Sequence, residues 1–504
     1  MTTPATGASF PLVLGPPEAF ARVREFLRAA AFDDATLCRE LKIEEMSDLQ
    51  KVKWEDVPLA ALPRPLRWCL ELFARGRPVA AEESERVGGP ELLAAFQTLG
   101  LVRPARHDSA KLVSTVWLYP ADGFVLVSDR PNDPDGDPFQ PADDLVFPAV
   151  YGGTFRFLEV LPEVRGGDAL DLCGGSGVGA LHLARTARSA ATADITARSA
   201  HFAEFNARLN GLAVSSLCGD LYSPVAGRRF DVISAHPPFV PSIGPSMVFR
   251  DGGNTGEDII RRVIEGFPAH LQPNGVGVVV CVARDTQDGD FERRVRAWLG
   301  ADGSECDVVF GVKKVLTVTE VVEQLRRTGR DVSEDEAHRL YGRLQAAGTR
   351  QFVAGTLFVR RGTDLAAEPP CRLQLTLDGR AADFERVLDW RRHCRRPGLT
   401  PWLTASRPRL APALRLAANH RVVDGGLVPT DSVFSIETGF AFALRVDSWV
   451  VPLIAQLNGE TTVAEVFDAA WAAGKLPKGF PLMALADLVR RMIEHGLLEV
   501  DFPR

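Results

Sequence analysis

The chain has few cysteines, no long apolar run and no excess of basic residues, and each shortage excludes a class of protein. Its eight cysteines are scattered over 504 residues with no C-x-x-C pair, which predicts reduced thiols and no zinc site. The longest uninterrupted apolar stretch, residues 276–283, is far shorter than the roughly 20 residues that cross a bilayer. The first residues lack the basic and apolar regions of a signal peptide, so we expect a cytoplasmic protein without a membrane anchor.

The net negative charge of the chain limits the kinds of molecule that it can bind. The formal net charge is −7 and the sequence pI is about 5.8, which argues against indiscriminate binding to nucleic acid but permits a local basic patch. Hydrophobic residues at 46% and charged residues at 24% indicate ordinary globular protein, and the length exceeds what one core supports. We therefore expect a multidomain enzyme.

Changes in pattern along the chain predict three domains, at residues 1–128, 129–363 and 364–504. The first combines helical apolar spacing with a final hairpin, and the last ends as helix, turn, helix, helix and short strand. Both patterns are typical of winged helices, and the last resembles PqqD-type peptide-binding modules. We expect a mainly helical, winged-helix-like accessory domain on each side of the middle domain.

A segment rich in proline and aspartate, residues 129–144, opens the middle domain. Asp133, Asp135 and Asp137 have the spacing of a calcium loop, but Pro138 stands where the sharp turn of such a loop requires glycine. The segment is therefore predicted to be a solvated linker, and we expect no metal.

The middle domain alternates short β-rich runs with helical runs, which is typical of a parallel α/β sheet. The predicted strands are residues 169–173, 192–195, 231–235, 276–283, 306–312 and 352–359, with helices at 318–327 and 334–347.

A glycine-rich turn follows the first of these strands, in the sequence ALDLCGGSGVG at residues 169–179. Glycines allow a ligand to approach the backbone closely and adopt conformations that a Cβ forbids. Gly175-x-Gly177-x-x-Ala180 also satisfies a degenerate dinucleotide-binding pattern, so the turn alone leaves both a nicotinamide cofactor and S-adenosylmethionine open.

Carboxylates at the ends of three successive strands favour S-adenosylmethionine. Asp171 can accept a hydrogen bond from the ammonium of a methionine moiety or fix a water beside it, Asp194 can accept both ribose hydroxyls, and Asp220 can accept from an adenine amino group. The three carboxylates would thus bind a methionine, a ribose and an adenine in turn. These are the parts of S-adenosylmethionine, which, unlike a dinucleotide, needs no pyrophosphate site.

The fourth strand ends in His236-Pro237-Pro238-Phe239, and the stretch FRDGGNTGEDIIRR follows at residues 249–262. With the glycine turn, this set resembles class I methyltransferases that carry a methyltransferase small domain, especially HemK-like glutamine N-methyltransferases and base N-methyltransferases of rRNA and tRNA. The resemblance covers residues 145 to about 361. It implies a Rossmann-like sheet, S-adenosylmethionine as cofactor and nitrogen as acceptor. The residues expected to bind the cofactor are Asp171, Gly174, Gly175, Gly177, Asp194, Ile195, Asp220, Leu221 and Tyr151.

His236 departs from the asparagine of this family. There, the asparagine oxygen and a proline carbonyl accept the two hydrogens of a planar –NH2, and the aromatic residue, here Phe239, stacks on it. A histidine accepts one hydrogen bond, only when neutral, and can also take a proton. We expect His236, Pro237, Pro238 and Phe239 to present an amine, imidazole, thiol or hydroxyl rather than a glutamine amide. The equally open alternative is that His236 only holds the loop.

Several residues carry two interpretations each. Ser242, Ser246 and Arg250 either line the acceptor pocket or are solvated, and Tyr151 either contacts the cofactor or makes a local turn. The basic run at 391–396, between Trp390 and Trp402, either binds a phosphate backbone or is a solvated face paired with acids. Cys173, in the place of the first glycine of the turn, is interpreted as a packing residue.

The sequence thus predicts an S-adenosylmethionine-dependent methyltransferase that acts on a nitrogen of a small molecule or peptide. An RNA base N-methyltransferase is the alternative within that class. A non-catalytic protein that binds the cofactor or a peptide is the second hypothesis, and a nicotinamide-linked dehydrogenase is the least favoured. The oligomeric state is left open.

Overall fold

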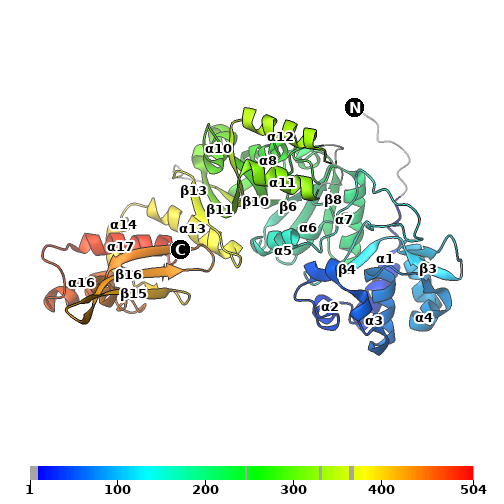
Figure 1. Ribbon diagram of the computed structural model, residues 1–504, viewed down its shortest axis with the longest axis horizontal. Helices are drawn as coiled ribbons and strands as arrows, with labels where there is room; N and C mark the ends of the chain where they lie inside the picture. The colour runs from blue at the N-terminus through cyan, green and yellow to red at the C-terminus, as the bar shows by residue number, and fades with distance from the viewer. Residues whose placement is uncertain (1–9, 244–246, 329–331, 363–367, 503–504) are drawn as a thin grey trace.

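The computed structural model describes residues 10–243, 247–328, 332–362 and 368–502 (Figure 1). A central sheet with flanking helices lies between the N-terminal helices at one end of the molecule and the C-terminal elements at the other. In the described residues, no helix combines the length and the apolar character that a membrane crossing requires.

The N-terminal part packs helices against a small sheet and ends in a hairpin. In α1, Phe20, Val23 and Leu27 recur at helical spacing and are buried, because that spacing places them on one face. The sheet has the order β1-β3-β2, and β4 pairs with β5 as the hairpin. The elements are α1 (Pro17–Ala29), α2 (Asp34–Leu41), α3 (Arg64–Cys69), β1 (Val79–Ala80), α4 (Ala81–Thr98), β2 (Val102–Pro104), β3 (Lys111–Ser114), β4 (Trp117–Ala121) and β5 (Phe124–Ser128).

The central sheet has the strand order β13-β11-β12-β10-β9-β6-β7-β8. Its pairs are parallel except those of β12, which runs antiparallel to both β10 and β11. The strands are β6 (Asp168–Leu172), β7 (Ser189–Asp194), β8 (Val214–Cys218), β9 (Phe230–Ala235), β10 (Leu271–Thr286), β11 (Cys306–Leu316), β12 (Thr349–Arg361) and β13 (Cys371–Gln374). The predicted Rossmann-like α/β class is confirmed. The sheet is mixed rather than wholly parallel, and its two edge strands, β8 and β13, are not among the predicted strand ranges.

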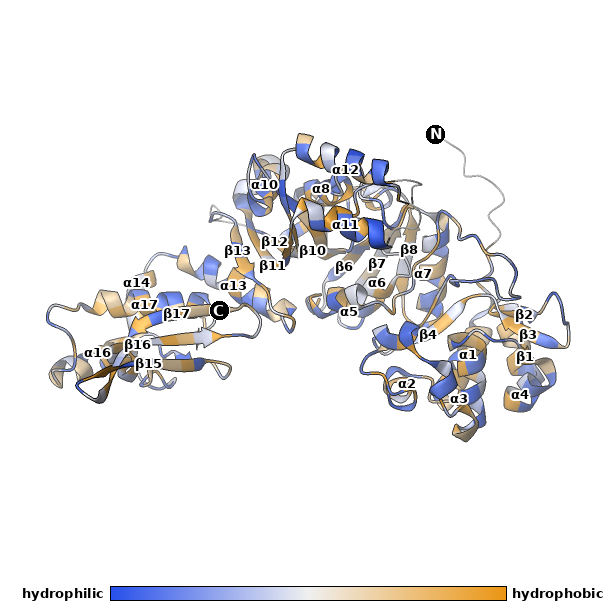
Figure 2. Cartoon of the chain, in the orientation of Figure 1, coloured by the Kyte–Doolittle hydropathy of each residue, from blue (hydrophilic) through white to orange (hydrophobic). Residues whose placement is uncertain are grey.

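Helices cover both faces of this sheet. One core cluster runs from the N-terminal helices through the hairpin to α5–α7 and the sheet face beneath them. A second cluster joins the other face to α8 and α10, and Figure 2 shows hydrophilic residues on the outer faces of α11 and α12. The helices are α5 (Gly152–Glu159), α6 (Val178–Leu183), α7 (Ala197–Asn210), α8 (Asp258–Glu265), α9 (Phe267–His270), α10 (Phe291–Trp298), α11 (Val318–Thr328) and α12 (Glu334–Ala346).

Two asparagines on α7 complete the open edge of β5. Asn206 accepts a hydrogen bond from the N–H of Val127 (2.8 Å) and donates to its carbonyl (3.1 Å), and Asn210 does the same at Val125 (2.9 and 2.7 Å). Residues four apart on a helix are separated by about 6 Å along its axis, and residues two apart on a strand by about 6.6 Å. The two asparagines of α7 are therefore spaced to reach two alternate residues of β5. Asn206 also donates to the carbonyl of Ser176 in the glycine turn (2.8 Å), which joins the hairpin to that turn.

Most residues from 131 to 143 are exposed, as expected of a solvated linker, but Asp133 and Asp135 are held by arginines of the N-terminal part. Asp135 accepts from side chains of Arg103 and Arg106, and Arg106 also pairs with Asp133. Hydrogen bonds from Arg103 lower the pKa of the Asp135 carboxyl, and the backbone N–H of Asp135 together with Arg106 lowers that of Asp133. The segment is therefore docked on the N-terminal part by charge pairing, which a composition rich in proline and aspartate does not reveal.

The C-terminal part contains a sheet that the sequence analysis did not predict, with the order β15-β16-β17. Helix α13 packs against the central sheet, where Phe384 stacks on Phe358 (ring centroids 4.2 Å apart), and the following elements form a separate core cluster. The elements are α13 (Ala381–Cys394), α14 (Leu399–Ala405), β14 (Arg409–Leu410), β15 (Arg415–Val423), β16 (Gly426–Ile436), β17 (Phe442–Asp447), α15 (Val451–Ile454), α16 (Val463–Ala472), α17 (Leu482–Glu494) and β18 (Leu498–Glu499).

The basic run at 391–396 is largely used within the fold. Arg391 is buried and donates to the carbonyl of Pro369, Arg392 donates to the side chain of Asn274, and Arg395 pairs with the buried carboxylate of Asp307. One of these acceptors is a carboxylate and two are neutral oxygens, so the three arginines are engaged within the protein. This supports the interpretation that the run serves the fold.

Replacing Asn206 by alanine is expected to lower the free energy of unfolding by about 2–4 kcal/mol, because it leaves backbone groups of Val127 buried without partners. Asn210→Ala is the matched control, since it removes the same pair of bonds at a half-buried position where water can replace them. Urea unfolding of both variants measures the difference, and equal losses would contradict the role assigned to Asn206.

Candidate functional site

The glycine-rich turn leaves the sheet at the carboxyl end of β6. Cys173, Gly175 and Gly177 all have positive φ (+57°, +51° and +81°), and Gly177 caps the start of α6. A Cβ at Gly174 would collide with the hydroxyl of Thr192, so this glycine is required for packing. A Cβ at Gly175 would meet nothing within 4 Å, so the backbone there faces open space. The turn therefore packs on one side and offers its backbone to a ligand on the other.

Asp171 lies beneath the turn. It is 2% exposed and accepts a hydrogen bond from the hydroxyl of Ser234 on β9 (2.7 Å), and a Cβ at Gly179 would lie 2.5 Å from its Oδ2. Burial raises the pKa of Asp171 to about 7. In this geometry the carboxyl braces the turn from below, and Ser234 is a partner that the sequence analysis missed.

Asp194 links the turn to the end of β7. Its carboxylate accepts hydrogen bonds from the backbone N–H of Gly175 (3.0 Å) and of Thr196 (3.1 Å), and the residue is only half-buried. The next side chain, Ile195, is apolar and 57% exposed. A carboxylate and an apolar surface thus stand together beside the open backbone of Gly175, as a ribose and a flat base require.

Asp220 lies further along the same edge, after β8. Its exposed carboxylate pairs with Arg262 of α8 (2.6 Å), and Leu221 beside it is buried with a positive φ of +48°. Arg262 is the last residue of the stretch 249–262, so this ion pair joins the loop after β9 to the loop after β8. The sequence analysis noted the stretch but did not predict this pair.

The strand register places these loops at one level of the sheet. Leu172 of β6 pairs with Ala193 of β7 on one side and with Ala235 of β9 on the other. The residues that follow, Cys173, Asp194 and His236, therefore leave the sheet side by side. Because the chain continues from β6 to β7 on one side and returns to β9 on the other, this is the switch point at which open α/β sheets bind ligands.

His236 begins the loop after β9 and stands among aromatic rings. Its imidazole is half-buried and lies nearly parallel to the rings of Phe157 (5.4 Å between centroids, 29°) and Phe239 (6.0 Å, 26°). Burial lowers the pKa of His236 to about 4. Among the described residues its ring nitrogens have no hydrogen-bond partner, so at neutral pH the ring is neutral and one nitrogen is free to accept a hydrogen bond.

The glycines of the stretch 249–262 allow it to pack on the His-Pro-Pro-Phe backbone. A Cβ at Gly252 would lie 2.8 Å from both the carbonyl oxygen of Pro238 and the Cα of Phe239. Glu257, 3% exposed, accepts hydrogen bonds from Arg284 and Arg294 (2.7 and 2.8 Å to Oε2) and anchors the stretch to β10. This buried ion pair was also missed, because Arg284 lies 27 residues further along the chain.

The remaining expected residues lie near the loop of His236, except one that falls outside the described residues. Tyr151 is 56% exposed, and a Cβ at Gly153 would lie 3.2 Å from its ring and 3.8 Å from the ring of His236. The backbone N–H of Ser242 donates to the carbonyl of Gly253, and the carbonyl of Arg250 accepts from Val240. Ser246 lies outside the described residues.

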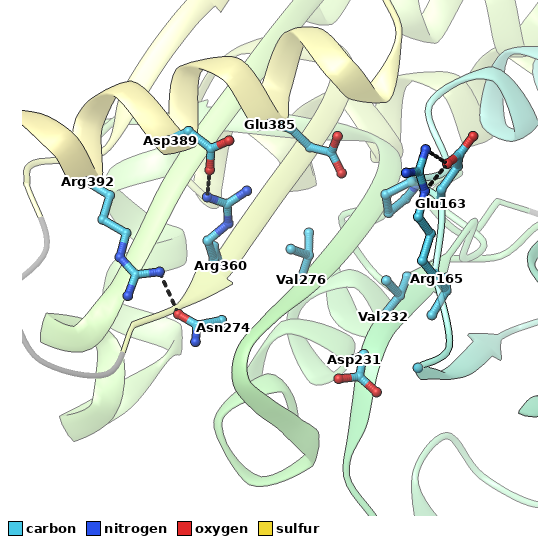
Figure 3. Close-up of a pocket in the computed structure, with 13 residues that line it drawn as sticks. Glu163, Arg165, Asp231, Val232, Asn274, Val276, Arg360, Glu385, Asp389 and Arg392 are labelled. Atoms are coloured by element: carbon cyan, nitrogen blue, oxygen red, sulfur yellow. Dashed lines mark hydrogen bonds and ion pairs between the residues drawn. The ribbon is translucent and has the colours of Figure 1, made fainter. Parts of the chain in front are cut away.

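A cavity of about 380 Å³ lies at the opposite edge of the sheet, between the strand starts and α13 (Figure 3). Arg360 pairs there with Asp389, and Arg392 donates to Asn274 (2.8 Å). The charges that face it are therefore largely paired, and it is remote from the glycine turn. Within the described ranges, no group of three or more histidine, cysteine or acidic side chains is arranged to hold a metal.

Comparison with known proteins agrees with this geometry. The methyltransferase small domain model matches residues 149–292. A ribosomal protein uL3 glutamine methyltransferase of Bradyrhizobium diazoefficiens is 30% identical over 207 residues, which cover 34% of this chain and 62% of that relative. A protein of Methanocaldococcus jannaschii, provisionally named as a protein N5-glutamine methyltransferase, is 30% identical over 145 residues. The match covers 27% of this chain and 68% of that relative.

Among the solved structures that the chain matches is the 16S rRNA N2 G1207 methyltransferase of T. thermophilus in complex with AdoMet and guanosine. It is 17% identical with a TM-score of 0.28, over 56% of this chain and 63% of that one. The sheet order and the matched domain place the present chain among the class I S-adenosylmethionine-dependent methyltransferases. Within that class, the chain belongs to the HemK-like branch with a methyltransferase small domain.

Asp171→Asn tests the buried carboxyl through the pH dependence of stability. Below about pH 4 the carboxyl is protonated in both the folded and the unfolded state, so its ionisation does not change the free energy of unfolding. Between pH 4 and about 7 the unfolded chain releases the proton while the folded protein keeps it, so wild-type stability falls as pH rises. We expect the stability of the variant, relative to wild type, to increase across this window in urea unfolding. A flat or decreasing difference would contradict the raised pKa; Asp468→Asn, an exposed carboxylate on α16, is the control.

Proposed function

We propose that this protein is an S-adenosylmethionine-dependent methyltransferase that transfers the methyl group to a nitrogen of a peptide or small molecule. One observation carries the proposal: the open backbone of Gly175, the carboxylate of Asp194 and the ring of His236 leave neighbouring strands at one level of the sheet. The relatives named as glutamine methyltransferases support the peptide nitrogen, although this chain spans only 62% of the first of them.

The site fits this cofactor along its length. The exposed carboxylate of Asp220 and the exposed side chain of Ile195 suit the adenine, and the half-buried carboxylate of Asp194 suits the ribose hydroxyls. The open backbone at Gly175 leaves room for the methionine end, while Gly174 and Gly177 pack against Thr192 and Ala203 and hold the turn in place. Asp171 braces the turn from below. Tyr151 stands beside that end, next to His236.

When bound, the cofactor supplies an electrophilic methyl group on a positively charged sulfonium, so the chain has only to present a neutral nucleophile in line. His236 is neutral at pH 7 and can accept a hydrogen bond from the acceptor nitrogen, while Phe239 offers a stacking face. Because the pKa of His236 is about 4, the ring holds a proton poorly at neutral pH. Its environment therefore suits orientation of the acceptor better than storage of its proton.

Asp194→Asn tests cofactor binding. The change keeps the size of the side chain but replaces a carboxylate acceptor by a neutral amide, and we expect the Kd for S-adenosylhomocysteine to rise at least about tenfold. Isothermal titration calorimetry measures it, with Asp468→Asn as the matched control. If wild-type protein binds a nicotinamide dinucleotide and no S-adenosylhomocysteine, the proposed function is wrong.

His236→Asn separates chemistry from cofactor binding. We expect turnover to fall at least about tenfold while the Kd for S-adenosylhomocysteine changes less than about twofold, because His236 faces the acceptor side. S-adenosylhomocysteine release from a panel of amine-, imidazole- and amide-bearing peptides measures turnover. Turnover equal to that of wild type would contradict the orienting role of His236. No release with any member of the panel would favour a cofactor-binding protein without turnover.

A further inference from the structure

Three exposed aromatic side chains gather at the acceptor end of the site. Phe147 is 42%, Tyr151 56% and Phe249 38% exposed. The ring of Phe147 is stacked on that of Phe249 (5.4 Å between centroids, 21°) and stands edge-on to that of Tyr151 (5.9 Å, 85°). Large apolar side chains that remain exposed together beside a site mark a surface that a ligand covers.

These rings are connected to His236 by the loops that carry them. Phe147 and Tyr151 precede α5, and the absent side chain of Gly153 leaves a gap that a Cβ would fill against both Tyr151 and His236. Phe249 lies on the stretch that is tied to the loop of His236 by hydrogen bonds between Val240 and its partners Arg250 and Gly252 (3.0 and 2.8 Å). The three rings and the imidazole of His236 are therefore carried by loops that lie against one another.

The number of hydrogen bonds that His236 can accept distinguishes between kinds of methyl-accepting nitrogen. A neutral imidazole has a single acceptor nitrogen, which one N–H satisfies, whereas a primary amide also needs a second acceptor, such as a proline carbonyl of the same loop. A ring with one N–H matches that capacity, and its flat faces match stacked aromatic rings.

We infer that Phe147, Tyr151, Phe249 and His236 form an acceptor subsite for an aromatic nitrogen heterocycle with a single N–H, of which the imidazole of a histidine residue is the simplest biological example. The inference rests on the proposed function and names its substrate class. The pyridine-type nitrogen forms a bond to the methyl carbon, the sulfur–carbon bond breaks with its electron pair left on sulfur, and the remaining N–H, hydrogen-bonded to His236, releases its proton to water.

The test compares two matched probes in the presence of saturating S-adenosylhomocysteine. N-acetylhistidine methylamide and N-acetylglutamine methylamide are titrated above pH 7, where the first is mainly neutral, and binding is followed by NMR saturation transfer. We expect the imidazole probe to bind at least about tenfold more tightly than the amide probe. Phe147→Leu and Phe249→Leu should each weaken the imidazole probe about three- to tenfold and leave the Kd for S-adenosylhomocysteine unchanged.

Trp471→Leu, at an exposed aromatic on α16, is the matched control and should change neither affinity. Because Phe147 and Phe249 are exposed, the thermal unfolding midpoints of their variants should stay near that of wild type. If S-adenosylhomocysteine binds but the amide probe binds as tightly as the imidazole probe, or neither probe binds, the heterocycle inference is overturned. Imidazole binding that is insensitive to both leucine variants overturns it equally. Failure of S-adenosylhomocysteine to bind wild type instead overturns the proposed function.

Discussion

The backbone register between β6 and its two neighbours is the constraint on which the site depends. Because Leu172 is paired with both Ala193 and Ala235, three loops with different chemistry begin at one height: a glycine turn, a carboxylate and an imidazole. A shift of one residue in either pairing would turn the side chains of a strand to the opposite face and separate these groups. Parallel pairing within a buried sheet, sealed by apolar residues on both faces, makes such a shift costly.

Buried polar side chains then connect each loop to the rest of the protein. Asp171 and Ser234 brace the glycine turn, Asn206 joins that turn to the N-terminal hairpin, and Glu257 holds the acceptor stretch through two arginines. Each such group loses its hydration on folding and is tolerated only with its partners in place. Asn206 therefore makes a direct hydrogen-bonded connection between the N-terminal hairpin and the glycine turn.

The surroundings of His236 differ in character from those of Asp194 and Asp220. Carboxylates line the path from Asp194 to Asp220, whereas aromatic rings surround His236 and burial keeps its imidazole neutral. Direct displacement from a sulfonium needs a neutral nucleophile, and an apolar, uncharged surrounding favours one. Three arginines of the run 391–396 donate hydrogen bonds within the fold, to a backbone carbonyl, an amide oxygen and a carboxylate.

The sequence by itself determined the α/β class, the glycine turn and the residues at the strand ends, because strands, turns and strand-end carboxylates leave local patterns of apolar spacing and glycine. Local pattern did not reveal Ser234, Arg262 or Arg284 as partners, since each meets its carboxylate only after distant strands and helices pack together. It also misjudged the aspartates at 133–137 and left β15–β17 unpredicted, because the exposed β15 shows no apolar alternation. Only the tertiary structure decided that His236 is neutral and faces aromatic rings, because burial and long-range packing set the state of a titrating side chain.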